Sequence, residues 1–384
     1  MTLSSPLART VDLDPARNAT QADVAARFHP EYGPALGRLP AGQRVFHGLP
    51  FDLGPQADAS RWILVDRPTT IELPPAGLAS HVIVAHLCDT WRDDAGTRPA
   101  GLPIGHVVPV GEPLARYTVV DRTGTELSRI IRRRFEVNDG ILGWGSGAFA
   151  GIPHVANEAI DWRGPHEAQG PGRYAPAGQS GSLTIMPGTY GANQVGVSDY
   201  VPSPTGDALL WLHAIELGPD AEPVAVRLEP LAGGRRGSDV IIAAITLFRG
   251  SASPLVRGAR VQVRVAGLDD RPEVDLGSII RTQPVSAVPA SGDPASAIVG
   301  WGTPRAGGDT TSSSARIIDL TLAPDAALRL GDWTIPAVDL MAGGTLREPK
   351  GPGTIELLPA ARVPVEVEIV DRATGERSAA RVRF

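Results

Sequence analysis

Short apolar runs separated by turn residues dominate the chain from about residue 44 onward. They cover residues 45–53, 62–65, 70–73, 81–88, 116–120, 129–137, 208–217, 224–231, 240–248 and 260–265. Runs of this length bounded by Gly, Pro, Asn, Asp or Ser are typical of β-strands. The run 240–248 is apolar on both faces and predicts a central strand covered on two sides, whereas the valines of 260–265 alternate with polar residues and predict a strand with one solvent-facing side. The pattern therefore predicts an all-β fold.

The helical signal is confined to the first part of the chain. Residues 20–28 have a helical pattern, with Thr20 as the capping residue and Pro30 limiting its end. Farther along, residues 121–124 read Asp-Arg-Thr-Gly, a turn sequence, so the strands on either side are expected to pair as a hairpin.

Two apolar runs resemble each other, since residues 80–89 and 207–217 each carry an internal histidine. A weak repeat of a jelly-roll strand and a chance similarity both remain open as explanations. His213 shares a face with apolar residues, and we expect it to be a hydrogen-bonded core histidine.

Composition divides the chain into four parts. We predict an N-terminal arm at residues 1–37 and a β-sandwich or jelly-roll domain at 38–270, with a long irregular loop at 138–206. Residues 271–315 are rich in Ser, Pro, Gly and Ala and predict an irregular linker, and residues 316–384 predict a small β domain. The expected architecture is thus a tandem of β-sandwich or jelly-roll domains with very little helix.

Charge and cysteine content narrow the class of protein. A formal net charge of −6 gives no attraction to nucleic acids or anionic membranes, so neither is expected as a partner. The densest basic cluster, residues 132–134, alternates between two faces of a predicted strand, which favours a solvated strand over an anion site. Cys88 is the single cysteine and lies in an apolar run, where we expect it to pack as a small hydrophobic residue. No segment approaches the roughly 20 apolar residues that cross a bilayer, and no leader pattern opens the chain, so we predict a cytoplasmic location.

The long loop gathers the side chains best suited to binding. Sugar rings present flat C–H faces that pack on aromatic rings and hydroxyl rims that need acidic and basic partners. Asp139 is expected on this polar rim. The predicted ligand-binding residues are Trp144, His154, Asp161, Trp162, Arg163, His166, Tyr190, Asp199 and Tyr200. The alternative, in which these aromatic residues close the open end of a sandwich, stays open.

Catalytic chemistry has weaker support from the spacing of residues. Paired carboxylates for glycoside hydrolysis would come from Glu158, Asp161 or Asp199, but spacing within a loop fixes no distance between them. His154 and His166 match no compact metal-ligand motif, so no metal and no other cofactor is expected.

Two segments resemble known families. Residues 46–54, Phe-His-Gly-Leu-Pro-Phe-Asp-Leu-Gly, with Ile-Glu-Leu-Pro at 71–74 and the run 81–87, resemble the opening strands of galactose-binding-like jelly rolls that accompany bacterial carbohydrate-active enzymes. Residues 363–376, Val-Pro-Val-Glu-Val-Glu-Ile-Val-Asp-Arg-Ala-Thr-Gly-Glu, with Ala-Arg-Val-Arg-Phe at 380–384, resemble the small β domain that precedes the catalytic part of carbaryl-hydrolase-like metallohydrolases of the PHP superfamily.

The second resemblance implies that the chain is the non-catalytic N-terminal region of such a protein, with an attached metallohydrolase domain beyond residue 384. The His-rich metal motif of that family has no counterpart in this chain, so no catalytic residue can be carried over. We therefore expect a non-catalytic binding or accessory module for a saccharide-like or other small polar ligand. A glycoside-processing hydrolase and a structural module that forms homo-oligomers remain open as alternatives.

Overall fold

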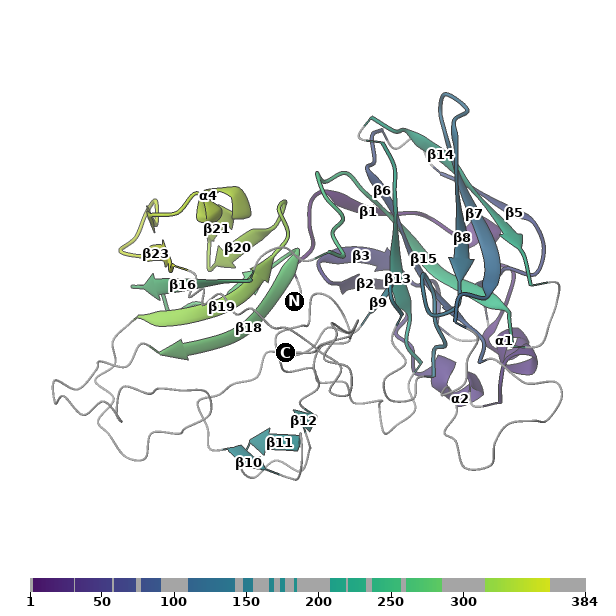
Figure 1. Cartoon of the computed structure of the whole chain (residues 1–384), viewed down its shortest axis with the longest axis horizontal. Coiled ribbons are helices and arrows are strands. Elements are labelled where there is room, and N and C mark those ends of the chain that lie inside the picture. The colour runs from purple at the N-terminus through teal and green to yellow at the C-terminus, as the bar shows by residue number, and fades with distance from the viewer. Residues whose placement is uncertain are drawn as a thin grey trace, which may run out of the picture.

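Antiparallel β-sheets make up most of the fold. The computed structural model describes residues 3–30, 32–56, 59–73, 77–90, 110–141, 148–154, 166–168, 173–176, 183–184, 208–218, 220–232, 237–256, 260–284 and 315–359. Helices in this described part are short: η1 (Asp14–Ala16), α1 (Gln21–Arg27), α2 (Tyr32–Gly37) and α4 (Ala337–Met341). The all-β prediction is confirmed, and Figure 1 shows the sheets in two neighbouring groups.

A six-stranded and a four-stranded sheet form the larger group. The first has the order β1 (Ala8–Thr10), β15 (Val240–Phe248), β6 (His81–Cys88), β13 (Trp211–Glu216) and β9 (Ile152–Pro153), with β4 (Ile63–Leu64) also paired to β15. The second has the order β5 (Thr69–Glu72), β14 (Pro223–Pro230), β7 (Pro113–Asp121) and β8 (Glu126–Arg132). As predicted, β7 and β8 pair as an antiparallel hairpin.

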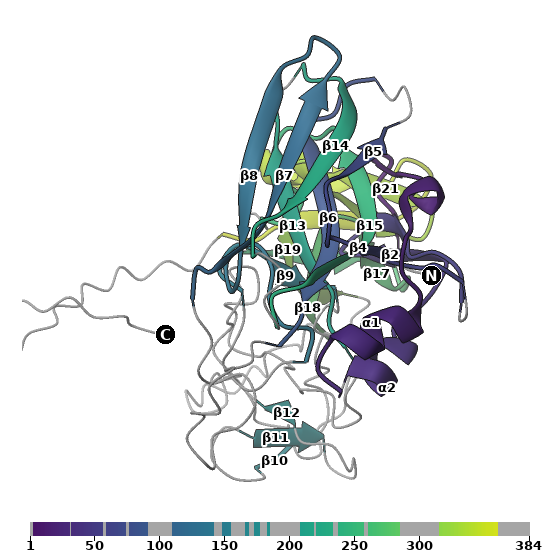
Figure 2. The ribbon, with the colours of Figure 1, turned by 90° about the vertical axis from the view of Figure 1, so that its right-hand side faces the viewer.

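One cluster of buried apolar side chains draws on both of these sheets. From the six-stranded sheet come residues such as Val84, Ile215 and Ile245, and from the four-stranded sheet Tyr117 and Val226. Figure 2 shows the second sheet, with β7, β8 and β14, lying over the first. Because alternate side chains of a strand point to opposite faces, the other face of the six-stranded sheet requires a cover of its own.

A second apolar cluster supplies that cover. It joins the other face of β6 and β15 to helices α1 and α2 and to the hairpin of β2 (Gln43–Phe46) and β3 (Leu49–Asp52). All nine residues of β15 are buried, which confirms the predicted central strand with two covered faces.

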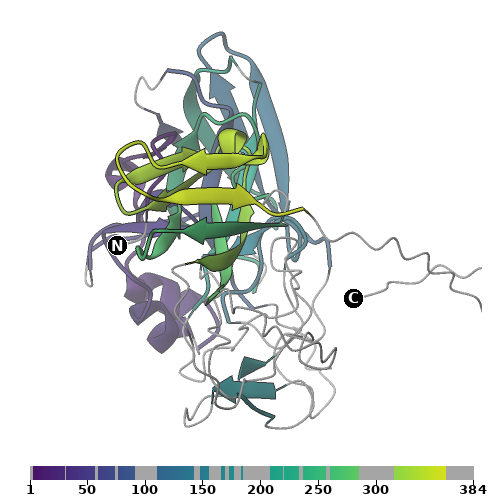
Figure 3. The same cartoon turned by 90° about the vertical axis from the view of Figure 1, so that its left-hand side faces the viewer.

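The smaller group of sheets follows in sequence and joins the same cluster. Its five-stranded sheet has the order β18 (Gly277–Pro284), β19 (Arg316–Leu322), β16 (Arg260–Ala266), β23 (Thr354–Leu357) and β22 (Thr345–Arg347). Its three-stranded sheet has the order β17 (Pro272–Val274), β20 (Ala327–Leu330) and β21 (Trp333–Pro336). Figure 3 shows these sheets from the side away from the larger group. A further three-stranded sheet pairs β10 (His166–Ala168), β11 (Arg173–Pro176) and β12 (Leu183–Thr184).

Strand β16 and the strands that follow it belong to the smaller group of sheets. The alternating valine strand, β16, pairs with β19 and β23 of the smaller group and not with strands before residue 250. Strands β17 and β18 occupy part of the segment 271–315, for which irregular structure was predicted. The division of the chain into domains, and the jelly-roll topology, stay predictions.

The N-terminal residues 1–37 are integrated into the larger group of sheets where the structure describes them. Strand β1 pairs with β15, and helix α1 starts at a capping box in which Thr20 accepts from the Asp23 amide and Asp23 accepts from the Thr20 amide. This confirms the predicted capped helix. No helix in the described part of the chain is long and apolar enough to cross a membrane.

Candidate functional site

Most residues of the predicted loop site lie outside the described residues. These are Trp144, Glu158, Asp161, Trp162, Arg163, Tyr190, Asp199 and Tyr200. Of the two remaining, His166 opens β10, whose backbone pairs with β11. The ligand-binding and catalytic roles predicted for these residues therefore stay predictions.

His154 is the member of that set whose side chain the structure describes. It is only 6% exposed, and its Nδ1 accepts a hydrogen bond from the Leu210 amide at 3.1 Å. The imidazole meets the Phe46 ring edge to face, with centroids 4.9 Å apart. These contacts tie the end of β9 to the segment that enters β13 and to the β2–β3 hairpin, so they hold elements together.

Asp139 lies in the core and not on the polar rim where the sequence placed it. It is 2% exposed, accepts from the Tyr32 hydroxyl and accepts from the Ile141 amide at 2.9 Å. The Cys88 carbonyl oxygen lies 2.8 Å from the same hydroxyl oxygen. Burial raises the pKa of Asp139, and burial with the neighbouring carboxylates raises that of Tyr32. This group fastens α2 to the end of β6.

Arg133 is also buried, which corrects the expectation of a solvated strand at residues 132–134. Its side chain is fully buried, and Nε donates to Glu112 at 2.9 Å while Nη1 donates to the Asp89 carbonyl at 2.7 Å. Nη2 donates to the Gly237 carbonyl. A buried guanidinium is tolerated because a carboxylate and backbone oxygens satisfy it.

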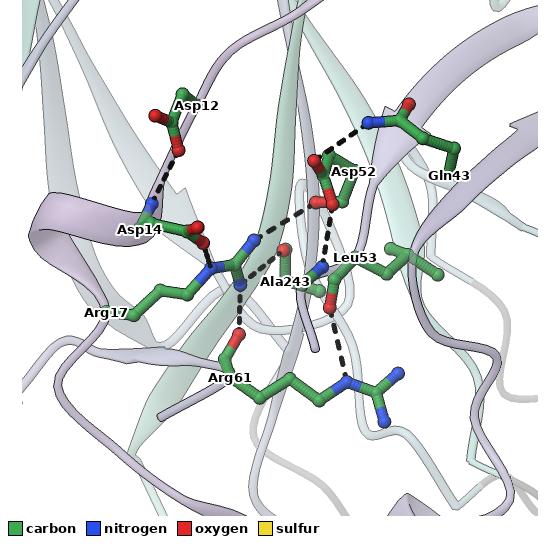
Figure 4. Close-up of polar contacts among 9 residues, drawn as sticks. Asp12, Asp14, Arg17, Gln43, Asp52, Leu53, Arg61 and Ala243 are labelled. Atoms are coloured by element: carbon green, nitrogen blue, oxygen red, sulfur yellow. Dashed lines mark hydrogen bonds and ion pairs between the residues drawn. The ribbon is translucent and has the colours of Figure 1, made fainter. Parts of the chain in front are cut away.

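Two more buried arginines join the N-terminal segment to the sheets. Figure 4 shows the Arg17 guanidinium among the carbonyl oxygens of Asp52, Arg61 and Ala243, and it also meets the Asp14 carboxylate at 2.9 Å. Arg61 donates to the carbonyls of Leu39, Pro40 and Leu53 and lies over the Trp62 ring. Desolvation lowers the pKa of Arg61, and the Arg17 charge lowers it further. Backbone carbonyl oxygens accept from both guanidinium groups, so the two arginines stabilise the packing of the N-terminal segment against the sheets.

A pair of histidines lies between the two large sheets. His86 is fully buried, with Nδ1 3.1 Å from the Tyr117 hydroxyl and Nε2 3.0 Å from the Glu136 carbonyl oxygen. Its ring stacks on that of His213, at 6.4 Å and 17°. His213 is hydrogen-bonded through Nδ1 to the Ala150 carbonyl at 2.9 Å. Desolvation lowers the pKa of His86 to about 3, and the neighbouring His213 lowers it further.

The described residues form a groove at one end of the smaller group of sheets. It has a volume of about 340 Å³ and lies between β21, α4 and β22. Figure 1 shows α4 beside β21 at the top of the smaller group of sheets. The volume lies at the small end of the roughly 300–1,000 Å³ found for small-molecule sites. The lining residues are Trp333, Thr334, Ile335, Pro336, Asp339, Ala342, Gly343, Leu346 and Arg347.

Three side chains give this groove its chemistry. Trp333 provides a half-buried aromatic ring, and the exposed Asp339 and Arg347 provide a carboxylate and a guanidinium. Neither charged group has a hydrogen bond or ion pair within the described part of the chain. The groove thus combines an apolar face with one acceptor and one donor group that are available to a ligand.

Sequence reasoning missed this groove, although two signals were present. Trp333 lies directly after a Gly-Asp turn, and Gly343-Gly344 follows the helix and has φ near 82° at both residues. Positive φ values are accessible to glycine without steric cost, so the pair lets the chain reverse from α4 into β22. That reversal brings Arg347 to the same groove as Trp333.

Metal ligation has no support among the described residues, where no group of three His, Cys, Asp or Glu side chains is placed to hold an ion. Comparisons with family models, curated proteins and solved structures gave no match to this chain. The described residues thus form an all-β fold and, between β21, α4 and β22, a groove with aromatic and charged side chains.

Proposed function

We propose that this chain is a binding module for a saccharide-like or other small polar ligand, which it takes up in the groove lined by Trp333. The observation that carries the proposal is the meeting of an indole ring, a carboxylate and a guanidinium in one groove of about 340 Å³. A pyranose ring needs a flat apolar surface for its C–H face and charged or polar partners for its hydroxyl groups.

The charges in the groove favour a polar ligand over an apolar one. An apolar ligand would leave Asp339 and Arg347 desolvated without partners, and this costs free energy. A ligand with several hydroxyl groups would instead donate to the carboxylate and accept from the guanidinium. Charge-assisted hydrogen bonds of this kind are roughly twice as strong as neutral ones.

The accessory role belongs to the same proposal and rests on the resemblance of residues 363–384 to the domain that precedes a metallohydrolase. Those residues lie outside the described ones. Glycoside hydrolysis by Glu158, Asp161 or Asp199 stays an alternative prediction, since these carboxylates also lie outside them.

A glycan array probed with the full chain, followed by calorimetric titration of the strongest hit, tests the proposal. Trp333→Ala should weaken that binding about tenfold or more, since loss of an aromatic partner removes at least about 1.4 kcal/mol of stacking and burial. Val338→Ala is the matched control, because Val338 is exposed on α4 but does not line the groove. Equal affinities for the parent chain and Trp333→Ala would remove the groove as the site.

A further inference from the structure

We infer that the turn after β8 carries a second binding site, for a carboxylate borne on a flat ring, formed by Arg134, Phe135 and Phe149. We call these three residues the Phe149 platform. The site lies in the larger group of sheets, is separate from the Trp333 groove and does not depend on it.

The first observation is the unequal pairing of three consecutive arginines. Arg132 is paired with Glu136 at 2.5 Å, and Arg133 with Glu112 at 2.9 Å. Arg134 has no carboxylate, and its Nε is buried without a hydrogen-bond acceptor in the described part of the chain. Of the three guanidinium groups, Arg134 is therefore the one whose charge is left without a carboxylate by the described residues, and a ligand carboxylate could supply that partner.

The second observation is an exposed aromatic surface beside that guanidinium. The Phe149 ring is 54% exposed and lies 5.8 Å from the Arg134 guanidinium carbon. Phe135 packs against it with centroids 5.2 Å apart. Exposed phenylalanines are poorly solvated, and a cation above a ring is favourable, so the pair offers an apolar face with a positive edge.

The third observation is that the backbone fixes this arrangement. The Phe149 amide donates to the Arg134 carbonyl at 2.9 Å, and the Ala150 amide donates to the Phe135 carbonyl at 2.9 Å. Arg134 itself has φ of 63°, a conformation that a non-glycine residue adopts at a cost of about 1 kcal/mol or more. Glycine would adopt this conformation without the steric cost. The position holds an arginine although its backbone conformation favours glycine.

A carboxylate on a flat ring matches all three observations. The carboxylate would accept from the terminal Nη groups of the Arg134 guanidinium, and the ring would lie against Phe149. Arg132 is already neutralised by Glu136, so the net positive charge of the platform resides on Arg134. Two kinds of compound share this chemistry, the uronic acid sugars and the aromatic carboxylic acids.

Ligand-observed NMR with the full chain at low salt distinguishes these sources. The probes are glucuronate and benzoate, with glucose and benzyl alcohol as the neutral counterparts. We expect at least one acid to bind about tenfold more tightly than its neutral counterpart, because a charge-assisted hydrogen bond contributes more than a neutral one. Equal binding of acid and neutral partners, or no binding of either acid, would overturn the inference.

Variants locate the site. Arg134→Gly removes the guanidinium and relieves the positive φ, so it should retain or raise the melting temperature while acid binding falls about tenfold. Phe149→Ala should also weaken acid binding, whereas Arg227→Gln, which removes a charge paired with Glu126 away from the platform, should change it less than about threefold. Unchanged acid binding in Arg134→Gly would refute the assignment. Trp333→Ala should leave acid binding at the Phe149 platform unaltered. A negative result for the platform can therefore be told apart from a negative result for the Trp333 groove.

Discussion

Replacing His86 by glutamine should make the stability of this protein less sensitive to acid. His86 is fully buried between the two large sheets, and desolvation with the nearby His213 lowers its pKa from 6.5 to about 3. In the unfolded chain the same imidazole regains its ordinary value near 6.5. Between these two values the unfolded state binds the additional proton, so stability is complete above about pH 6.5 and falls as the pH drops towards 3.

The size of the effect follows from the two pKa values. At pH 5, about 1.5 units below the unfolded value, the His86 imidazole contributes a loss of about 2 kcal/mol, since each unit corresponds to about 1.4 kcal/mol. His213, whose pKa is also lowered by burial, adds a loss of the same sign. For a urea m-value of about 2–3 kcal/mol/M, the His86 contribution moves the midpoint by about 0.7–1 M between pH 8 and pH 5.

The measurement is urea unfolding from pH 8 to pH 5, followed by tryptophan fluorescence, for the parent chain and His86→Gln. The variant should show a midpoint that depends less on pH by about the amount given above. Tyr117→Phe is the matched control: it removes the hydroxyl 3.1 Å from Nδ1 but keeps the imidazole, so it should lower stability at every pH and keep the slope. Parallel pH profiles for the parent and His86→Gln would refute the reasoning.

Three further outcomes follow from the structure. Gly48→Ala should severely destabilise the protein, as judged by its melting temperature, because a Cβ there would lie 1.6 Å from the Asp275 carbonyl oxygen at a φ of 76°; Gly42→Ala, at a φ of 66° in open space, is the control. Thr20→Ala should lower the free energy of unfolding by about 1 kcal/mol in urea titrations, because it removes the N-cap of α1. Cys88 should resist alkylation in the native state and react after denaturation, since burial raises its pKa to about 12; rapid labelling of folded protein would contradict this.

Local patterns predicted the elements whose stability is local. The capped helix α1, the central strand β15 and the hairpin of β7 and β8 were all readable because their signals lie within about ten residues. The strands that pair with β16 could not be predicted from the sequence pattern. Its valine alternation gives the correct strand, but the partner β19 begins about fifty residues later, and alternation carries no information about which sheet a strand joins.

The misreading of residues 132–134 has a geometric cause. A strand of period two over residues 129–137 predicts that the charges are split between two faces. Strand β8 ends at Arg132, and Arg134 adopts a left-handed conformation, so the alternation stops there. Arg133 shares the buried face of Ile131, and it is kept there by its ion pair with Glu112, which precedes β7 and is brought close by the hairpin. A single positive φ in a non-glycine residue is not encoded in hydrophobic periodicity.

Polar residues of this protein fall into two classes, those whose contacts stabilise the fold and those that are available to a ligand. Arg133 and Asp139 are buried, and their contacts are to neighbouring protein groups, with Oδ1 of Asp139 accepting from Tyr32 and Ile141, so their chemistry serves the fold. Arg134, Asp339 and Arg347 have no such partners among the described residues, and each lies beside an aromatic ring or in a groove. From residue type alone, Arg133 and Arg134 are equally good candidates for ligand binding. Because unsatisfied hydrogen-bonding capacity depends on contacts distant in sequence, only the folded arrangement assigns one arginine to the core and its neighbour to binding.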